Sequence, residues 1–238
     1  MPTIGLIYPD HAAEDDYPLA EGLLDGVRLP VEHIYGTDLH AVPELLDLGS
    51  PERLAEGARL LAKHEPDAVV WACTSGSFVY RWDGAAEQVA KLAEAAGKPA
   101  SSTSFAFVRA AAALGLRRVS VAASYPDDVA KLFVEFLGAG GVEVVSMSSE
   151  DIDTAAEVGR LPADAVVELA LAHDHPDADA VLVPDTAMRT LGVLNRIEQR
   201  LGKPVLTANQ VTIWEGLRLA GQSVPVDSLG ALFRRRDA

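Results

Sequence analysis

The feature that most constrains the fold of this chain is an internal repeat. Residues 67–74 (DAVVWACT) match residues 179–186 (DAVLVPDT) at an offset of 112 residues. Two shorter landmarks also recur, Gly-Lys-Pro at residues 97–99 and 202–204 and Tyr-Pro-Asp at residues 8–10 and 125–127. Each tripeptide alone is common turn chemistry. Three landmarks in the same order predict two similar halves.

Within each half, short apolar runs alternate with helical segments. The predicted strands are residues 4–8, 68–72, 119–122, 142–147, 180–183 and 205–207. The predicted helices are residues 51–64, 83–96, 105–114, 127–137, 162–173, 188–201 and 211–219. Nearly continuous apolar strands are typical of parallel sheets that are covered on both faces. The alternation therefore predicts an α/β fold with a parallel sheet in each half.

Composition excludes several classes of protein. Lys and Arg number 20 and Asp and Glu number 35, so the net charge is −15. Such an acidic surface argues against nucleic acid and anionic membranes as partners, since both are polyanions. The single cysteine excludes an intramolecular disulfide and a multi-cysteine zinc site. No apolar run is long enough to span a bilayer, and no basic segment precedes the first strand, so we expect a cytoplasmic protein.

Two chemistry-bearing residues occupy matching places in the repeat. Cys73 and Asp185 each follow a predicted strand, where ligands sit in open parallel sheets. If the halves face each other, a thiol and a carboxylate point into one cleft from opposite sides. Such a pair suits proton transfer at a planar carbon. A helix starting after Cys73 would lower its pKa toward a reactive thiolate.

Hydroxyl and N–H donors surround these two positions. Thr74 and Ser75 follow Cys73, Thr186 follows Asp185, and Ser124 and Tyr125 end another predicted strand. A strand-to-helix turn with such groups can hold a carboxylate and stabilise an enediolate. We therefore predict a small carboxylate substrate held by neutral donors.

Plainer interpretations of the same residues remain open. Cys73 can be a small buried apolar residue, Asp185 a helix cap, and Tyr125 a core side chain. His173 and His175 form a solvated loop in our interpretation, because no third metal ligand accompanies them. No Gly-x-Gly-x-x-Gly follows the first predicted strand, so a dinucleotide-binding turn is missing.

Three blocks of the sequence resemble one known family. Residues 71–78 (WACTSGSF) resemble the first catalytic motif of the aspartate/glutamate racemase superfamily. The resemblance is closest to the branch that holds maleate cis–trans isomerase, arylmalonate decarboxylase and the ectoine-utilisation isomerase-like proteins. Residues 123–129 resemble its tyrosine segment, and residues 182–191 with 202–210 and Trp214 resemble its second motif and C-terminal region.

This resemblance implies two Rossmann-like halves related by a pseudo-twofold axis, with the active-site cleft between them. It implies no metal and no organic cofactor, and a homodimer or a larger homo-oligomer. The first half would span residues 1–111 and the second residues 112–211. Residues 212–238 would then cross back to the first half, as the last helix does in such folds.

Residue by residue, the resemblance places Cys73 on the family's first catalytic cysteine. Thr74, Ser75 and Tyr125 fall on carboxylate-binding positions of the decarboxylases. Asp185 falls on the second cysteine, which is a departure. The racemases and isomerases keep both cysteines, and the decarboxylases keep only the second, whereas this chain keeps only the first. The acidic loop at residues 9–16 also lacks the substrate-binding Asn of the maleate isomerases.

The sequence thus predicts a cofactor-independent isomerase or racemase of a small carboxylic acid. Cys73 would act as nucleophile or base, and Asp185 would exchange a proton on the opposite face. One alternative is a decarboxylase of substituted malonates that uses Cys73 as proton donor. Another is a catalytically silent protein that binds carboxylates.

Overall fold

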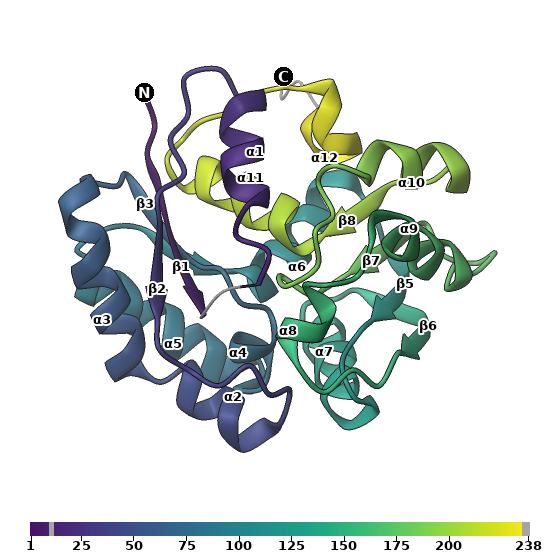
Figure 1. Cartoon of the computed structure of the whole chain (residues 1–238), viewed down its shortest axis with the longest axis horizontal. Helices are drawn as coiled ribbons and strands as arrows, with labels where there is room; N and C mark the ends of the chain where they lie inside the picture. Colours follow the sequence, from purple (N-terminus) through teal and green to yellow (C-terminus); the bar gives the residue numbers. More distant parts are fainter. Residues whose placement is uncertain (10–11, 235–238) are drawn as a thin grey trace.

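The computed structural model describes residues 1–9 and 12–234, which form two α/β halves (Figure 1). Each half contains a four-stranded parallel sheet, with strand order β2-β1-β3-β4 in the first and β6-β5-β7-β8 in the second. The two orders are the same when strands are counted from the start of each half. The predicted fold class and the predicted repeat are therefore confirmed.

The first sheet consists of β1 (Ile4–Pro9), β2 (Val31–Ile34), β3 (Ala68–Trp71) and β4 (Ala100–Ser102). The second consists of β5 (Arg118–Ala123), β6 (Glu143–Ser149), β7 (Ala180–Val183) and β8 (Val205–Thr207). The helices of the first half are α1 (Asp16–Leu23), α2 (Val42–Leu48), α3 (Pro51–Leu61), α4 (Ser75–Phe78), α5 (Arg81–Ala96) and α6 (Thr103–Leu114). Those that follow are α7 (Asp127–Ala139), α8 (Ala155–Val158), α9 (Ala163–Ala172), α10 (Leu194–Leu201), α11 (Ala208–Leu219) and α12 (Gly230–Arg234). Two 3-10 turns, η1 (Ala62–His64) and η2 (Asp227–Leu229), complete the described elements.

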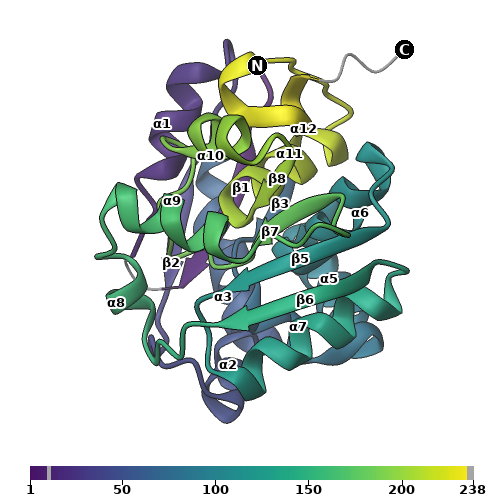
Figure 2. The ribbon, with the colours of Figure 1, turned by 90° about the vertical axis from the view of Figure 1, so that its right-hand side faces the viewer.

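The central strands are buried on both faces, as their apolar runs predict. Every residue of β3 and of β7 is buried, whereas the edge strands β2 and β6 are largely half-buried. Figure 2 shows the second sheet with its strands in one layer and α7 along its lower edge. Helices on both sides of each sheet remove its apolar faces from water, which is the main stabilising term of such a fold.

Several elements were not predicted from the sequence, among them β2, α1, α2, α8 and α12. The strand β2 carries Glu32 and His33 and stays partly exposed, so its apolar pattern is weak. It forms because β1 offers it a free parallel edge, with Leu6 opposite Val31. Tertiary pairing here overrides a weak local pattern.

The helix predicted over residues 188–201 is shorter in the structure and begins at Leu194. The backbone N–H groups of Thr190 and Leu191 donate to the Asp16 carboxylate, at 3.0 and 3.4 Å. Residues 188–193 therefore form turns that contact the first half instead of a regular helix.

The chain returns toward the first sheet after β8. Thr212 of α11 and Thr103 of α6 share a hydrogen bond of 2.6 Å, and Gly216 of α11 faces Ile4 of β1. Figure 1 shows α11 between α1 and α6, behind the junction of the two halves. The division into residues 1–111 with 212–238 and residues 112–211 stays a prediction.

The strand order fixes where a ligand can enter. In both sheets the first and third strands are neighbours, and their connections leave in opposite directions along the sheet. Ligands of open α/β sheets bind beyond the carboxyl ends of such strands. Those ends carry Tyr8 and Cys73 in the first half and Tyr125 and Asp185 in the second. Across the described part of the chain, no helix combines the length and apolarity needed to cross a membrane.

Candidate active site

A small pocket lies at this position and receives side chains from both halves. Its cavity volume is about 30 Å³, within about 460 Å³ of empty space that includes the open mouth. The lining residues are Tyr8, Pro9, Ala12, Thr37, Asp38, His40, Leu45, Leu48, Cys73, Ser75, Ala155, Asp185, Thr186 and Ala187. Cys73, Ser75, Asp185 and Thr186, four of the residues singled out from the sequence, thus meet in one cavity.

The Cys73 thiol sits at the start of the short helix α4. Its sulfur accepts a hydrogen bond from the Gly76 N–H at 3.3 Å and lies 3.7 Å from the Ser75 hydroxyl oxygen. Burial nevertheless raises the pKa of the thiol from 9.0 to about 11. Cys73 is therefore a protonated thiol at neutral pH, and the sequence-based expectation of a lowered pKa is wrong. Helix α4 has only four residues, so its N-terminus offsets little of the desolvation.

Gly76 is required for this geometry. A Cβ at this position would lie 3.1 Å from the Cys73 sulfur and 2.9 Å from a ring carbon of Trp71. The Gly76 carbonyl accepts hydrogen bonds from Trp71 Nε1 and Gln88 Nε2, at 3.2 and 2.9 Å. The turn after β3 is thus fixed by buried side chains of its own half.

Asp185 approaches from the second half and is held by two hydrogen bonds. Its Oδ1 accepts from the Ala187 N–H at 2.9 Å, and its Oδ2 accepts from the Ser124 hydroxyl at 2.5 Å. The side chain is 4 % exposed. The Ala187 contact is the cap-like bond anticipated by the plainer interpretation, although the residues that follow form a turn and not a helix.

Two tyrosines fix the backbone on either side of Asp185. The Tyr125 hydroxyl donates to the Pro184 carbonyl and the Tyr8 hydroxyl donates to the Thr186 carbonyl, each at 2.9 Å. These tyrosines belong to the repeated Tyr-Pro-Asp landmark, so the repeat has a structural role. Burial raises the pKa of both well above 10.0, which keeps both hydroxyls protonated.

Three predicted carboxylate-binding residues lie behind the lining of the pocket. Thr74, Ser124 and Tyr125 are fully buried, and the last two donate their hydroxyl protons to Asp185 and Pro184. The Thr74 hydroxyl makes no hydrogen bond of ordinary geometry with the described residues. Ser75 and Thr186 reach the pocket directly. The binding role of all five residues stays a prediction.

His40 and Asp38 are ionisable pocket residues that sequence reasoning missed, and His40 is the one beside Asp185. It lies in the connection between β2 and α2, outside every motif, and its side chain is 4 % exposed. Its Nε2 is 3.9 Å from Asp185 Oδ2. Since β2 itself was not predicted, no local signal marked the segment that delivers this residue.

Two arginines that follow the motifs of Cys73 and Asp185 in the sequence are engaged elsewhere. Arg189 binds Asp15 and the carbonyls of Ala12 and Gly159, and Arg81 pairs with Glu135. Among the described residues, no Lys or Arg lines the pocket. His11, in the acidic loop after the first strand, lies outside the described residues. No cluster of metal-ligating side chains occurs within the described ranges.

Comparison with known proteins places the chain in a family. The sequence profile of the arylmalonate decarboxylases matches residues 48–233. The chain belongs to the arylmalonate decarboxylase family. It is 32% identical over 236 residues to the arylmalonate decarboxylase of Bordetella bronchiseptica, covering 92% of this chain and 91% of that protein. A maleate isomerase of Geobacillus stearothermophilus is 27% identical over 136 residues, 57% of this chain and 54% of that protein.

Solved structures of this family have the same fold. A liganded arylmalonate decarboxylase, with one glycine replaced by cysteine and one cysteine by serine, superposes with a TM-score of 0.87. It is 28% identical, and the match covers 98% of this chain and 99% of that one. The maleate isomerase of Pseudomonas putida S16 has a TM-score of 0.86 at 20% identity, with 98% of both chains covered, and shows the fold alone. The predicted family branch is confirmed.

Proposed function

We propose that this protein decarboxylates a small 2-substituted malonate and that Cys73 protonates the carbon that loses CO2. The observation that carries this proposal is a buried, protonated thiol in a pocket that also holds hydroxyl donors. The bond between the central carbon and one carboxylate breaks, CO2 leaves, and the electron pair moves into the remaining carboxylate as an enediolate. The thiol then gives its proton to the carbon, and the thiolate recovers a proton from water.

The retained carboxylate requires donors, and no Lys or Arg occurs among the described residues that line the pocket. Ser75 and Thr186 line the pocket and offer hydroxyls there. Thr74 offers a buried hydroxyl that makes no hydrogen bond of ordinary geometry with the described residues. Such preorganised donors stabilise charge as it develops on the enediolate. Tyr125 and Ser124 support this cradle by fixing Pro184 and Asp185.

The apolar lining residues of the pocket indicate the kind of substituent. Leu45, Leu48 and Ala155 line the pocket together with the hydroxyl donors. An apolar 2-substituent of the malonate would bury its surface there. A charged 2-substituent would lose its hydration without gaining a cationic partner.

A second candidate function is isomerisation or racemisation of a small carboxylic acid, the function that the sequence alone favours. The observation that favours it is the entry of Cys73 and Asp185 into one pocket from different halves. Cis–trans isomerisation by addition to a double bond needs a thiolate, whereas the raised pKa of Cys73 keeps the thiol protonated. This argument places decarboxylation before isomerisation.

The experiment is proton NMR in D2O with aryl- and alkylmalonates, maleate and both enantiomers of aspartate and glutamate. We expect CO2 release and one deuterium in the monocarboxylate product from a malonate, and loss of turnover by at least about 100-fold in Cys73→Ser. Thermal melting should show that this variant is folded. Conversion of maleate or of one amino-acid enantiomer would instead support the second candidate. Ligand-induced stabilisation without any turnover would identify a binding protein.

A further inference from the structure

His40 is held in the pocket by the second half of the molecule, although its segment follows a strand of the first sheet. Its backbone N–H donates to the Asp153 carbonyl at 2.7 Å, and the preceding Leu39 forms an antiparallel bridge with Thr154. The imidazole packs edge-on against the Tyr125 ring, with centroids 5.0 Å apart and an interplanar angle of 88°. This buried side chain is thus fixed on three sides.

The hydrogen bonds of His40 determine which nitrogen faces the pocket. Its Nδ1 lies 3.0 Å from the Ile152 carbonyl oxygen, which only accepts hydrogen bonds, so Nδ1 carries a proton. The other nitrogen, Nε2, is directed toward Asp185 Oδ2 at 3.9 Å. In the neutral imidazole Nε2 therefore has a free lone pair beside the carboxylate, within a pocket that also contains Cys73.

We propose that His40 is the proton-carrying group opposite Cys73, with Asp185 as its orienting partner, and that the protein exchanges and racemises the α-proton of the 2-substituted monocarboxylate product. This inference rests on the proposed function for the identity of the product. His40 Nε2 takes the α-proton, and the electron pair of that C–H bond moves into the carboxylate. The Cys73 thiol then donates its proton to the other face of the enediolate, which gives the mirror-image acid.

Charge is conserved in this step, because a neutral thiol and a neutral imidazole become a thiolate and an imidazolium. Proton exchange with water returns both groups to their first state, and the opposite direction starts from the charged pair. Asp185 lies where it stabilises the imidazolium. Both Asp185 oxygens already accept hydrogen bonds from Ser124 and Ala187, which suits a positioning carboxylate better than a proton-transferring one.

Other ionisable groups also lie near His40. The Tyr125 hydroxyl is bound to Pro184, and burial raises its pKa. Asp38 lies on the same segment as His40 and lines the pocket, and the Asp153 carboxylate is on an exposed residue. Asp185 is therefore the carboxylate that the structure places against Nε2 of His40.

The test is α-proton exchange in D2O with each enantiomer of 2-phenylpropionate and of 2-methylbutyrate, which requires no decarboxylation. We expect the wild-type protein to exchange the α-proton and His40→Gln to lose this activity by about 100-fold. The matched control is His64→Gln, since His64 pairs with Glu32 at 2.7 Å far from the pocket lining. It should exchange at the wild-type rate.

The pH–rate profile separates His40 from Asp185. In Asp185→Asn we expect slower exchange with the inflection retained, because the imidazole loses the carboxylate that positions it. If His40→Gln keeps the inflection while Asp185→Asn removes it, Asp185 carries the proton and the proposal is wrong. If His40→Gln does not fold, His40→Ala with added imidazole replaces it. Recovery of exchange then supports the proposal, and no recovery overturns it.

The two proposals fail in different assays. Absence of CO2 release from every malonate overturns the proposed function, whereas exchange of the monocarboxylates by the wild-type protein would still support His40. Normal decarboxylation together with no exchange in the wild-type protein overturns the role of His40 and leaves decarboxylation by Cys73 standing.

Discussion

At the scale of single residues, burial outweighs the local features that would activate Cys73. The Gly76 N–H and the Ser75 hydroxyl both favour the thiolate, yet burial raises the pKa of the thiol to about 11. The side chain is 4 % exposed. A proton donor must carry its proton at the working pH, whereas a nucleophile must lose it, so this one property separates the two candidate reactions.

We therefore predict that Cys73 reacts slowly with iodoacetamide near neutral pH and faster as the pH approaches 11. Mass spectrometry measures this directly, since the chain has one cysteine. Free glutathione in the same buffers corrects for the reagent, and a circular dichroism spectrum at each pH verifies that the protein stays folded. Rapid alkylation with a plateau below pH 8 would indicate a thiolate and would return preference to the isomerase mechanism.

At the scale of elements, helix α11 packs closely against strand β1. A Cβ on Gly216 would lie 2.1 Å from Cγ2 of Ile4, so the helix rests directly on the strand. Glu215 of the same helix is buried and binds both Arg109 and Arg218. These contacts hold α11, which follows the last strand of the second sheet, against the first sheet.

Gly216→Ala should destabilise the protein by about 1–3 kcal/mol, because the added methyl group displaces Ile4 from its site on the sheet. The matched control is Gly138→Ala in helix α7, where a Cβ meets nothing within 4 Å. There the helix propensity of Ala should stabilise the fold by about 0.5–1 kcal/mol. Urea unfolding of both variants measures the two effects, and equal behaviour would contradict this account of α11.

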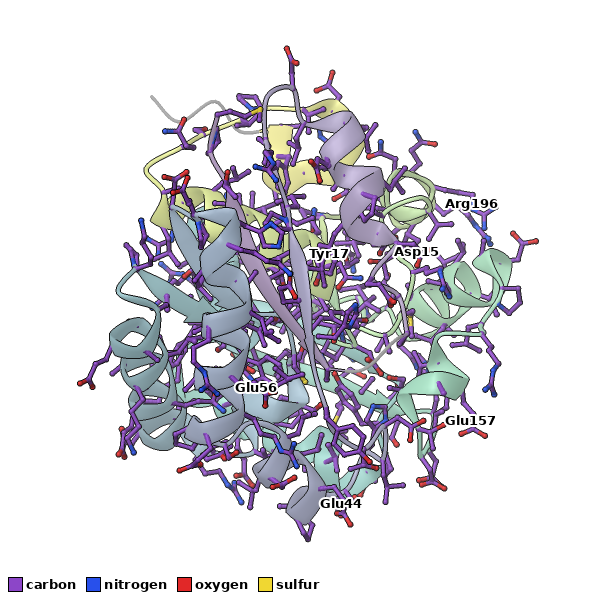
Figure 3. All side chains as sticks on the ribbon, turned by 60° about the vertical axis from the view of Figure 1, so that its left-hand side comes forward. Asp15, Tyr17, Glu44, Glu56, Glu157 and Arg196 are labelled. Atoms are coloured by element: carbon purple, nitrogen blue, oxygen red, sulfur yellow. The ribbon has the colours of Figure 1, made fainter. Side chains whose placement is uncertain are left out.

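At the scale of the whole molecule, buried polar contacts at the start of α1 join the two halves. Asp16 accepts hydrogen bonds from the backbone of Thr190 and Leu191 and from Asn209 Nδ2. The Tyr17 hydroxyl donates to Asn209 Oδ1 at 3.0 Å. Figure 3 labels Tyr17 beside α1 and Asp15 at the edge that faces the second half. The relative position of the halves, and so the pocket, depends on these bonds.

Asp16 gives this junction a pH dependence. Burial raises its pKa above the ordinary value of 3.8, so the folded protein holds the proton more tightly than the unfolded chain. The corresponding stability is complete below pH 3.8 and is lost as the pH rises through the folded-state pKa. We predict that Asp16→Asn gains stability relative to wild type as pH rises above 3.8, by about 1.4 kcal/mol per unit of pKa elevation.

Urea unfolding between pH 4 and 7 tests this prediction. Asp15→Asn is the control, because Asp15 is exposed and its ion pair with Arg189 contributes little. A stability difference between Asp16→Asn and wild type that stays constant or falls with pH would contradict the raised pKa.

The sequence by itself determined the two halves, the parallel sheets and the family. Strands such as β3 and β7 are apolar throughout because both faces are covered, and this pattern is local enough to be read without a structure. The repeat also placed Cys73 and Asp185 at equivalent strand ends, since the order of elements fixes which residues follow each strand. Both residues line the same pocket.

The tertiary structure decided which groups reach that pocket and in what chemical state. His40 enters through β2, an edge strand that forms by pairing with β1, and is held by backbone groups of the second half. Tyr125 and Ser124 turn out to hold the backbone and carboxylate of Asp185. Desolvation of Cys73 depends on atoms far apart in the sequence, and for that reason no local pattern could give its protonation state.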